Sequence, residues 1–456
     1  MKPNLIITAA LATAIVAGTA NAQPPIIQTS FTADPSPLVV GDTVYLYTGH
    51  DEDDAPQGQG RFKMQNWLLY TSTDMVNWTD HGPVASLADF KWTDRTNGAW
   101  ALGAIERNGK YYLYCPVHGN GIGVLVSDTP YGPFVDPIGK PLVWQKEHWE
   151  DIDPMAFIDD DGQAWLYWGN PSLYYVKLNE DMISYEGGIV KDPQIRRVEG
   201  QPSPYRFQEG PWAWKRGGQY YMSYASTCCP EGIGYSVGPS PTGPWEYKGY
   251  IMPPDRRATG NHPGVIDFKG RSYVFGFNFR LNFAITEHHH ERRSVCVAEI
   301  TYNPDGTIRE LPWWDEGTQV EQLELVDPYR RVEAETISWA QGLKTARSEQ
   351  AGMYVTQAHR DDYIKVQGVD FGRGASTFEV SAATITGGEI ELRLDSPDGR
   401  RIGICDVSNT IALNFWETFS TKVEPVSGVH DLYLVFTGGG RGGLFNLDWW
   451  RFNRSL

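Results

Sequence analysis

The first two thirds of the chain repeat one pattern of polar and apolar positions five times. Each copy begins with an acidic, aromatic or histidine residue, continues through a short apolar run and a glycine-containing turn, and ends in an aromatic-rich run. This predicts an antiparallel hairpin. The turn glycines recur at intervals of about 53 to 68 residues, near the repeat length of a propeller blade. The copies are Asp34–Tyr47, Trp100–Tyr114, Asp153–Tyr167, Glu209–Tyr221 and His262–Phe275. With almost no helical period between them, they predict an all-β, five-bladed β-propeller.

The pattern changes after the last copy. From about Arg330, short runs of alternating apolar and polar residues are separated by glycine turns, as in Tyr363–Gln367 and Glu389–Leu394. Roughly 125 residues of this pattern favour a β-sandwich. We therefore expect a propeller domain over residues 23–322 and a β-sandwich over residues 330–456.

The N-terminus has the pattern of a bacterial export signal. Met1-Lys2 is followed by an apolar run from Leu5 to Val16 and by the small residues Ala20-Asn21-Ala22. A charged start, a short apolar core and an A-x-A site are typical of a cleaved signal peptide, so we expect residues 1–22 to be removed from a secreted or periplasmic protein. No later apolar run reaches the length of a membrane span, so we expect no membrane partner.

Charge and aromatic content narrow the class of partner. The net charge of −17 argues against nucleic acid and anionic membranes, because phosphate groups would be repelled. The chain holds 17 Trp and 24 Tyr, which either stack on sugar rings or fill an aromatic-rich β-sheet core. Composition leaves both interpretations open for any single aromatic residue.

Five cysteines are an odd number for an exported protein. Cys115, Cys296 and Cys405 are isolated on predicted strands and are expected to be buried thiols. Cys228 and Cys229 are adjacent, so they form either a vicinal disulfide or two free thiols. Because they follow the predicted strand Tyr220–Tyr224 of the fourth repeat, we expect them to line the pocket.

The first residues of the copies carry the candidate chemistry. Equivalent positions of propeller blades surround one axis, so Asp34, Asp153 and Glu209 should converge at one mouth of the channel, with Trp100 and His262 beside them. Like charges held together raise the pKa of at least one carboxyl. One protonated and one ionised carboxyl are what acetal cleavage requires. Alternatively, each Asp-Pro only caps a turn.

From about Phe31 to Glu310 the chain resembles glycoside hydrolase family 43, the family of β-xylosidases and α-L-arabinofuranosidases, whose fold is a five-bladed propeller. The motifs that carry the resemblance are Thr32–Pro35, Asp74–Trp78, Ile152–Pro154, Gln208–Pro211, Asn261–Gly264, Arg293–Val295 and Asn303–Gly306. The resemblance implies that Asp34 is the general base, Glu209 the general acid and Asp153 the carboxylate that orients the acid and raises its pKa. It also implies inversion at the anomeric carbon, with acid and base about 6.5 to 9.5 Å apart.

The same resemblance implies roles for four further residues. His262 would face either a cation, such as calcium, or water in the channel, or else hold the carboxylates in place. Arg293, or its neighbour Arg292, would contact the acid or the substrate. Trp100 and Trp212 would form walls of the sugar pocket.

The second domain resembles carbohydrate-binding module family 6, a jelly-roll sandwich. The matching segments are Val332–Glu335, Asp362–Ile364, Trp416–Thr418 and Asn446–Trp449. By this resemblance, Tyr363 and Trp416 clamp one sugar ring and Asn446 hydrogen-bonds it. Alternatively, the module binds sugar at a different cleft, as some members of the family do. Glu333, Glu335 and Asp448 would hold a structural calcium, because calcium prefers oxygen ligands.

Together these patterns predict an exo-acting enzyme that releases arabinofuranose, xylose or both from arabinoxylan or its oligosaccharides. Its partner would be plant cell-wall polysaccharide, and no organic cofactor is expected. Three alternatives stay open: a catalytically inactive carbohydrate-binding protein, an endo-arabinanase, and a propeller enzyme that retains the anomeric configuration. The sequence decides neither the sugar nor the oligomeric state, because pocket depth depends on loops such as Asp51–Arg61.

Overall fold

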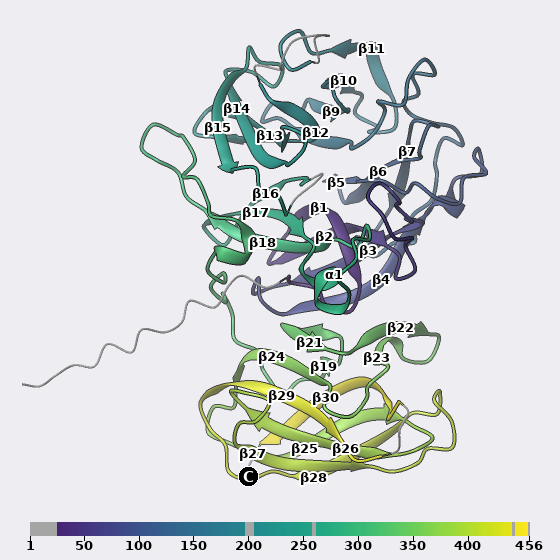
Figure 1. Cartoon of the computed structure of the whole chain (residues 1–456), viewed down its shortest axis with the longest axis vertical. Helices are drawn as coiled ribbons and strands as arrows, with labels where there is room; N and C mark the ends of the chain where they lie inside the picture. Colours follow the sequence, from purple (N-terminus) through teal and green to yellow (C-terminus); the bar gives the residue numbers. More distant parts are fainter. Residues whose placement is uncertain (1–24, 197–204, 258–260, 440–442, 455–456) are drawn as a thin grey trace, which may run out of the picture.

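A computed structural model describes residues 25–196, 205–257, 261–439 and 443–454 (Figure 1). The expected signal peptide, residues 1–22, lies outside the described residues. Strands make up nearly all the regular structure, with α1 (Arg280–Ile285) as a short helix between two strands. In the described part of the chain, no helix is long and apolar enough to cross a membrane.

The first domain is a ring of five antiparallel sheets, which confirms the predicted propeller. In chain order the sheets hold β1 (Phe31–Val40), β2 (Thr43–Asp51), β3 (Asn66–Ser72) and β4 (Trp78–Ser86); β5 (Gly103–Arg107), β6 (Lys110–Pro116) and β7 (Ile122–Ser127); β8 (Met155–Ile158), β9 (Ala164–Trp168), β10 (Tyr174–Leu178) and β11 (Tyr185–Lys191); β12 (Phe207–Arg216), β13 (Gln219–Ser226), β14 (Gly232–Gly238) and β15 (Glu246–Met252); and β16 (Gly264–Phe268), β17 (Arg271–Asn278) and β18 (Ser294–Ile300).

The first strand of each sheet lines the centre of the ring. Strands β1, β5, β8, β12 and β16 neighbour one another in that order, and β16 returns to β1. Backbone hydrogen bonds between the start and the end of the domain close the circle, such as Thr32 N–H to the Arg293 carbonyl at 2.9 Å. The heads of the five repeats therefore surround one channel, as the repeat predicted.

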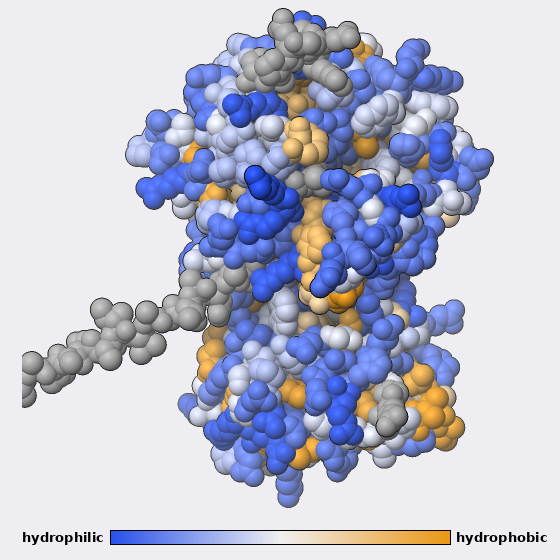
Figure 2. All heavy atoms as spheres, viewed as in Figure 1, coloured by the Kyte–Doolittle hydropathy of each residue, from blue (hydrophilic) through white to orange (hydrophobic). Residues whose placement is uncertain are grey.

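Tryptophan and tyrosine side chains fill much of the interior. Trp67, Trp78 and Trp168 are fully buried within the blades, and Trp450 is fully buried in the second domain. For these residues the aromatic content reflects β-sheet packing. The face seen in Figure 2 is mostly polar, with apolar side chains gathered in a few places on both domains.

The second domain is a β-sandwich of two sheets. One sheet holds β22 (Lys344–Ser348), β23 (Gly352–Thr356), β30 (Asn446–Arg454), β25 (Ala375–Ala383) and β28 (Glu417–Lys422), with β19 (Val332–Glu333) on β30; the other holds β21 (Trp339–Gln341), β24 (Tyr363–Asp370), β29 (Val429–Thr437), β26 (Gly388–Leu394) and β27 (Arg401–Val407). Alternate side chains of both sheets, including Phe378 and Phe436, meet in one core.

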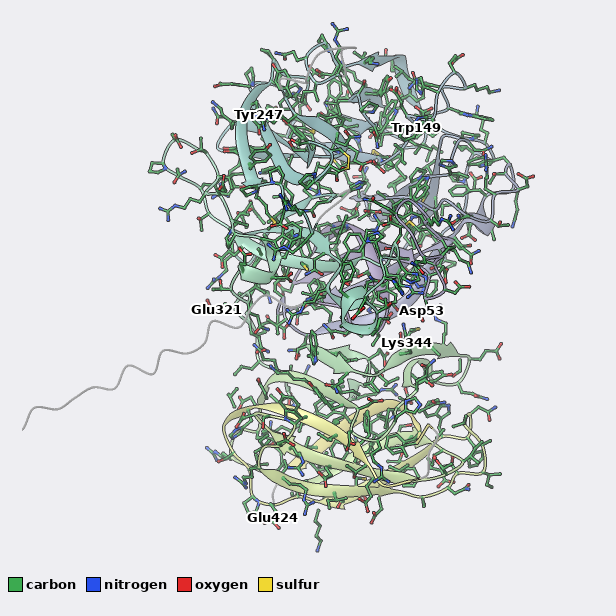
Figure 3. All side chains as sticks on the ribbon, in the orientation of Figure 1. Asp53, Trp149, Tyr247, Glu321, Lys344 and Glu424 are labelled. Carbon is green, nitrogen blue, oxygen red and sulfur yellow. A yellow bond between two sulfur atoms is a disulfide. The ribbon has the colours of Figure 1, made fainter. Side chains whose placement is uncertain are left out.

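The two domains share a sheet. Strand β20 (Thr336–Ile337) lies within the range expected for the sandwich, yet it pairs antiparallel with β4 and becomes the fifth strand of the first blade. Beside it, Lys344 Nζ lies 2.6 Å from Asp53 Oδ1, and Figure 3 labels this pair on the two sides of the junction. The Thr345 hydroxyl also donates to the buried carboxylate of Asp80 at 2.6 Å.

Candidate active site

Bulges in the innermost strands aim the acidic residues into the channel. Asp34 and Asp153 have φ angles of 49° and 56°, and each precedes a proline. In β12, Gly210 takes φ 59° before Pro211, directly after Glu209. The strand register shifts between Ala33 and Ser36 and again between Glu209 and Trp212. A left-handed residue bends the chain locally, so Asp34 and Glu209 turn out of their ladders, and Asp153 turns the chain just before β8.

These bulges bring six of the seven residues predicted in the propeller site into one pocket. Its volume is about 360 Å³, and its lining includes Asp34, Trp100, Asp153, Glu209, His262 and Arg293. Trp149, labelled in Figure 3, and Phe62 add aromatic surface. The pocket therefore combines carboxylates with aromatic walls, which suits a sugar ring.

His262 lies close to all three predicted catalytic carboxylates. Its Nδ1 lies 3.6 Å from Asp34 Oδ1, and its Nε2 lies 3.8 Å from Asp153 Oδ2 and 3.6 Å from Glu209 Oε1. Burial by itself favours the neutral ring, but the charges of Asp153, Asp34 and Glu209 outweigh it and raise the pKa of His262 to about 10. At neutral pH the ring is an imidazolium that offsets the negative charge of the trio.

Burial biases the Asp153 carboxyl towards its protonated form. Its side chain is buried, and burial raises its pKa well above the usual range. The charge of His262 opposes this shift, while Glu209 and Asp34 add to it. The buried Asp153 carboxyl therefore binds a proton more readily than an exposed aspartate would.

Arg293 holds the predicted base rather than the predicted acid. Its Nη1 donates to Asp34 Oδ1 at 2.7 Å, and its Nε and Nη2 bind the two carboxylate oxygens of Asp51 at 2.9 Å each. Arg293 is buried, so this charge-assisted network excludes water. The residue was expected at the acid or the substrate, and the structure places it against Asp34.

Glu209 is the most accessible of the three acids. Its side chain is 16% exposed, compared with 3% for Asp34 and 2% for Asp153. Asn170 Nδ2 donates to Glu209 Oε2, and Gln208 Nε2 donates to Asn170 Oδ1 at 2.9 Å. A carboxyl that is held by an amide and open to the pocket can reach the oxygen of a bound glycoside.

The same pocket contains a fourth carboxyl that the repeat pattern missed. Glu231 lines the pocket, is 2% exposed and accepts a hydrogen bond from Asn261 N–H at 3.0 Å. Burial, and then the charge of Glu209, raises the pKa of Glu231 to about 8. Glu231 directly follows Cys228-Cys229-Pro230, and in the sequence only this segment pointed to the loop that holds Glu231.

The two predicted aromatic walls have different positions. Trp100 lines the pocket, donates from its indole N–H to His118 Nδ1 at 3.0 Å, and contacts Phe62 edge to face. Trp212 lies in the core, where its indole N–H donates to the Val265 carbonyl at 2.8 Å. The prediction for Trp212 is wrong because the bulge after Glu209 shifts the register before Trp212, whose ring turns towards the last blade.

A cation could be held beside His262. Among the described residues, ligand atoms of Asp153, Glu209 and His262 lie within 4.8 Å of one another. Asp153 Oδ2 and His262 Nδ1 are buried and have no hydrogen-bond partner in the described part of the chain. Ligation of a small cation would require the neutral His262 ring, whereas an ordered water also fits the imidazolium.

In the sandwich, the aromatic partner of Trp416 differs from the expected one. Trp416 contacts Tyr354 with ring centroids 5.3 Å apart, whereas Tyr363 packs against Tyr433 at 5.6 Å. Tyr354 lies on β23, next to the β30 strand that begins with Asn446, while Tyr363 begins β24 of the other sheet. The structure therefore places Tyr354, and not Tyr363, beside Trp416.

Asn446 lies close to this aromatic pair. Its side-chain oxygen accepts from the Thr356 hydroxyl at 2.7 Å, and its amide donates to the Leu413 carbonyl at 3.0 Å. Thr356 is on the same strand as Tyr354, and Leu413 precedes Trp416 in the same loop. The expected sugar-binding residues Asn446 and Trp416 thus share one end of the sandwich.

Two of the three predicted calcium ligands of the sandwich form ion pairs with Arg331. Arg331 Nη2 lies 2.8 Å from Glu333 Oε2 and 3.0 Å from Asp448 Oδ1. Glu335 is buried, and burial raises its pKa to about 9. Within the described residues, the three carboxylates do not gather at the spacing of a common ion. In this arrangement Arg331 occupies two of the three predicted ligands.

Comparisons with known proteins agree with this architecture. The sequence model of the family 'Glycosyl hydrolases family 43' matches residues 22–308. The sequence model of the family 'Carbohydrate binding module (family 6)' matches residues 333–454. Arabinoxylan arabinofuranohydrolases of Paenibacillus polymyxa and Bacillus subtilis are 34% and 33% identical over 94% of this chain, covering 74% and 92% of their own lengths.

Of two similar solved structures, one matches both domains and the other matches about two thirds of the chain. A crystal structure of a glycoside hydrolase family 43 arabinoxylan arabinofuranohydrolase from Bacillus subtilis, in complex with cellotetraose, superposes with a TM-score of 0.82 and 31% identity, covering 96% of this chain and 99% of that chain. A β-xylosidase/α-arabinofuranosidase from a compost metagenome matches 64% of this chain and 98% of its own, with a TM-score of 0.57 and 29% identity. The chain belongs to glycosyl hydrolase family 43 and carries a family 6 carbohydrate-binding module.

Proposed function

We propose that the protein is an inverting, exo-acting α-L-arabinofuranosidase that removes arabinofuranose from arabinoxylan or its oligosaccharides. The observation that carries this proposal is the carboxylate trio held around His262 in a pocket of about 360 Å³. Relatives named for arabinoxylan match both domains, over 94% of this chain. A β-D-xylosidase activity is the second candidate, because relatives named xylosidase/arabinosidase match 62–63% of the chain.

In this mechanism the three acids have different roles in a single displacement at the anomeric carbon. Glu209 gives its proton to the glycosidic oxygen as the bond to the anomeric carbon breaks. Asp34 takes a proton from the water that attacks that carbon from the opposite face, so the configuration inverts. Arg293 fixes Asp34, and Asn170 fixes Glu209. Asp153 and His262 set the charge around the acid, because both lie beside Glu209 in the buried end of the pocket.

The test is hydrolysis of p-nitrophenyl α-L-arabinofuranoside and β-D-xyloside by wild type and Glu209→Ala, with arabinoxylan as a third substrate. We expect arabinofuranoside to be cleaved faster, the variant to lose about 10² to 10⁴-fold on arabinoxylan, and proton NMR to show an inverted product first. An aryl leaving group needs less acid help, so a smaller loss on the nitrophenyl substrates is compatible with the assignment. Wild type that releases nothing from any of the three would favour the inactive binding protein.

We also propose a cation or water beside His262, bound by Asp153, Glu209 and His262, where a calcium would neutralise carboxylate charge. A structural calcium in the sandwich is a separate proposal. Among the residues that the structure describes, none forms a hydrogen bond with the buried Oε2 of Glu335, which supports this site. Arg331 would have to leave Glu333 and Asp448. Calcium titration followed by thermal melting, on wild type and Glu335→Gln, tests this site. Export is proposed from residues 1–22, and N-terminal sequencing should then begin at Gln23.

A further inference from the structure

One wall of the sugar pocket is a pair of bonded sulfur atoms. Cys228 and Cys229 form a disulfide between β13 and β14, and both line the pocket that contains Glu209 and His262. Both cysteines are exposed. They are therefore open to a ligand and to a reductant from the same side.

The disulfide belongs to a short segment that also supplies Glu231. The two sulfurs and a carboxylate oxygen of Glu231 lie within 4.8 Å of one another. Glu231 in turn accepts the backbone N–H of Asn261, the neighbour of His262. The segment is fastened at its start by Thr227 N–H to the Arg206 carbonyl at 2.8 Å, and at its end by Asp255 N–H to the Glu231 carbonyl at 3.3 Å. The sulfur wall is thus placed relative to His262 through Glu231.

We propose that the Cys228–Cys229 disulfide is a specificity-determining wall of the pocket, against which the ring of the bound pentose packs. This inference rests on the proposed function and names a substrate contact for it. A disulfide has a polarizable surface with no strong hydrogen-bond donor, which suits the C–H face of a sugar. Two separate thiol side chains would rotate independently and would leave that face without a fixed partner.

Reduction supplies a direct probe of this wall. A dithiol such as dithiothreitol transfers two electrons and two protons to the pair, the S–S bond breaks, and the dithiol becomes a cyclic disulfide. The other three cysteines are buried free thiols. Burial raises the pKa of Cys115 and Cys296 well above the usual range and that of Cys405 to about 12, so they react poorly with alkylating agents.

The experiment measures kcat and KM of the full-length enzyme on p-nitrophenyl α-L-arabinofuranoside before reduction, after reduction, and after reoxidation. Iodoacetamide labelling with mass spectrometry reports which cysteines were reduced. We expect reduction to raise KM about tenfold with a smaller change in kcat, because the sulfurs contact the ring and not the reacting atoms. Reoxidation should restore KM. Cys228→Ala/Cys229→Ala should have the raised KM with and without reductant, while the control Cys405→Ala should respond to reductant like wild type.

A binding measurement separates this inference from the proposed function. Titration of Glu209→Ala/Tyr354→Ala/Trp416→Ala, in which the sandwich site is also removed, with an arabinoxylan oligosaccharide that carries one arabinofuranosyl group needs no catalysis, and its Kd should rise about tenfold on reduction. If untreated wild type cleaves no substrate, the proposed function fails, and the two Kd values still decide the role of the disulfide. Labelling of both cysteines with unchanged KM and Kd would overturn the inference, and so would oxidised protein that binds no such oligosaccharide.

Discussion

Arg293 Nη1 lies 2.7 Å from Asp34 Oδ1, and this ion pair joins residues 259 positions apart in the chain. Asp34 lies on the first blade, and Arg293 directly precedes β18 of the last blade. The residue predicted to activate water is therefore fixed by the closure of the propeller ring. Anything that loosens this closure should affect chemistry as well as stability.

Arg293→Lys tests that link while keeping the positive charge. An ammonium cannot serve Asp34 and both oxygens of Asp51 as the guanidinium fork does, and the lost buried hydrogen bonds should lower the free energy of unfolding by about 1–3 kcal/mol. We expect kcat to fall about 10 to 100-fold, because a base that is misplaced slightly loses much of its rate. Urea unfolding and steady-state kinetics measure both effects. A stable variant with wild-type kcat would show that Arg293 only supports the fold.

The pKa of His262 predicts a loss of stability in alkali. It is raised from 6.5 to about 10, so the stabilisation is fully present below pH 6.5 and disappears as pH rises through 10. Glu231 adds a loss between about pH 4.5 and 8, because its pKa is raised from 4.5 to about 8 and burial opposes its ionisation. Melting curves from pH 6 to 10 should show a smaller decline for His262→Gln than for wild type. Equal declines would mean that His262 is not the group that titrates.

The position of His262 leaves no room for a side chain at residue 210. A Cβ at Gly210 would lie 2.8 Å from the imidazole Cγ, and the residue has φ +59°. Gly210→Ala should therefore push His262 from the carboxylates, reduce kcat at least about tenfold and cost about 1–2 kcal/mol of stability from the backbone alone. Gly217→Ala is the matched control, because it has φ +57° in the same hairpin with nothing within 4 Å of its Cβ. Gly217→Ala should melt earlier and keep its kcat.

Thr345→Val tests the contact between the domains. The Thr345 hydroxyl donates to Asp80 across the junction, and Asp80 is buried. Removing the donor leaves a buried carboxylate oxygen unpaired, which should cost about 1–3 kcal/mol. Thr345→Ser keeps the hydroxyl and should cost less. Calorimetry should show the propeller transition moving with the sandwich transition, and independent melting of the two domains would contradict shared stability.

Binding by the sandwich should depend on Tyr354 more than on Tyr363. Tyr354 contacts Trp416, whereas Tyr363 packs on Tyr433. In a Glu209→Ala background, Tyr354→Ala should weaken retention by arabinoxylan in affinity electrophoresis about tenfold, the usual size of an aromatic contact. Tyr363→Ala should shift retention much less. The reverse order would restore Tyr363 to the binding site.

Repetition explains which site residues the sequence could predict. Asp34, Asp153, Glu209 and His262 each begin a copy of one pattern, so equivalence around the channel placed them together. Glu231 lies in a loop between strands and outside the repeated part, where no periodicity constrains its position.

Bulges and strand pairing explain where the sequence failed. Trp212 is three residues after Glu209, but the register shift between them sends its ring into the core. Tyr354 and Tyr363 are both near a strand end, and the choice between them depends on which strand pairs with β30. Alternation within a strand is visible in a sequence, whereas a one-residue bulge or the identity of a neighbouring strand depends on distant segments.

The sharing of a sheet by β4 and β20 fixes the direction in which the sandwich faces the propeller. A flexible linker would let a bound polysaccharide sample many approaches, and its local concentration at the pocket would depend on linker length. Here the backbone hydrogen bonds between β4 and β20 fix both the distance and the angle between the sandwich and the catalytic pocket. The enzyme should therefore favour arabinose side groups at a characteristic distance from the polysaccharide segment bound by the sandwich. The spacing of released arabinose along a polymer would then reflect the geometry of the junction between the domains.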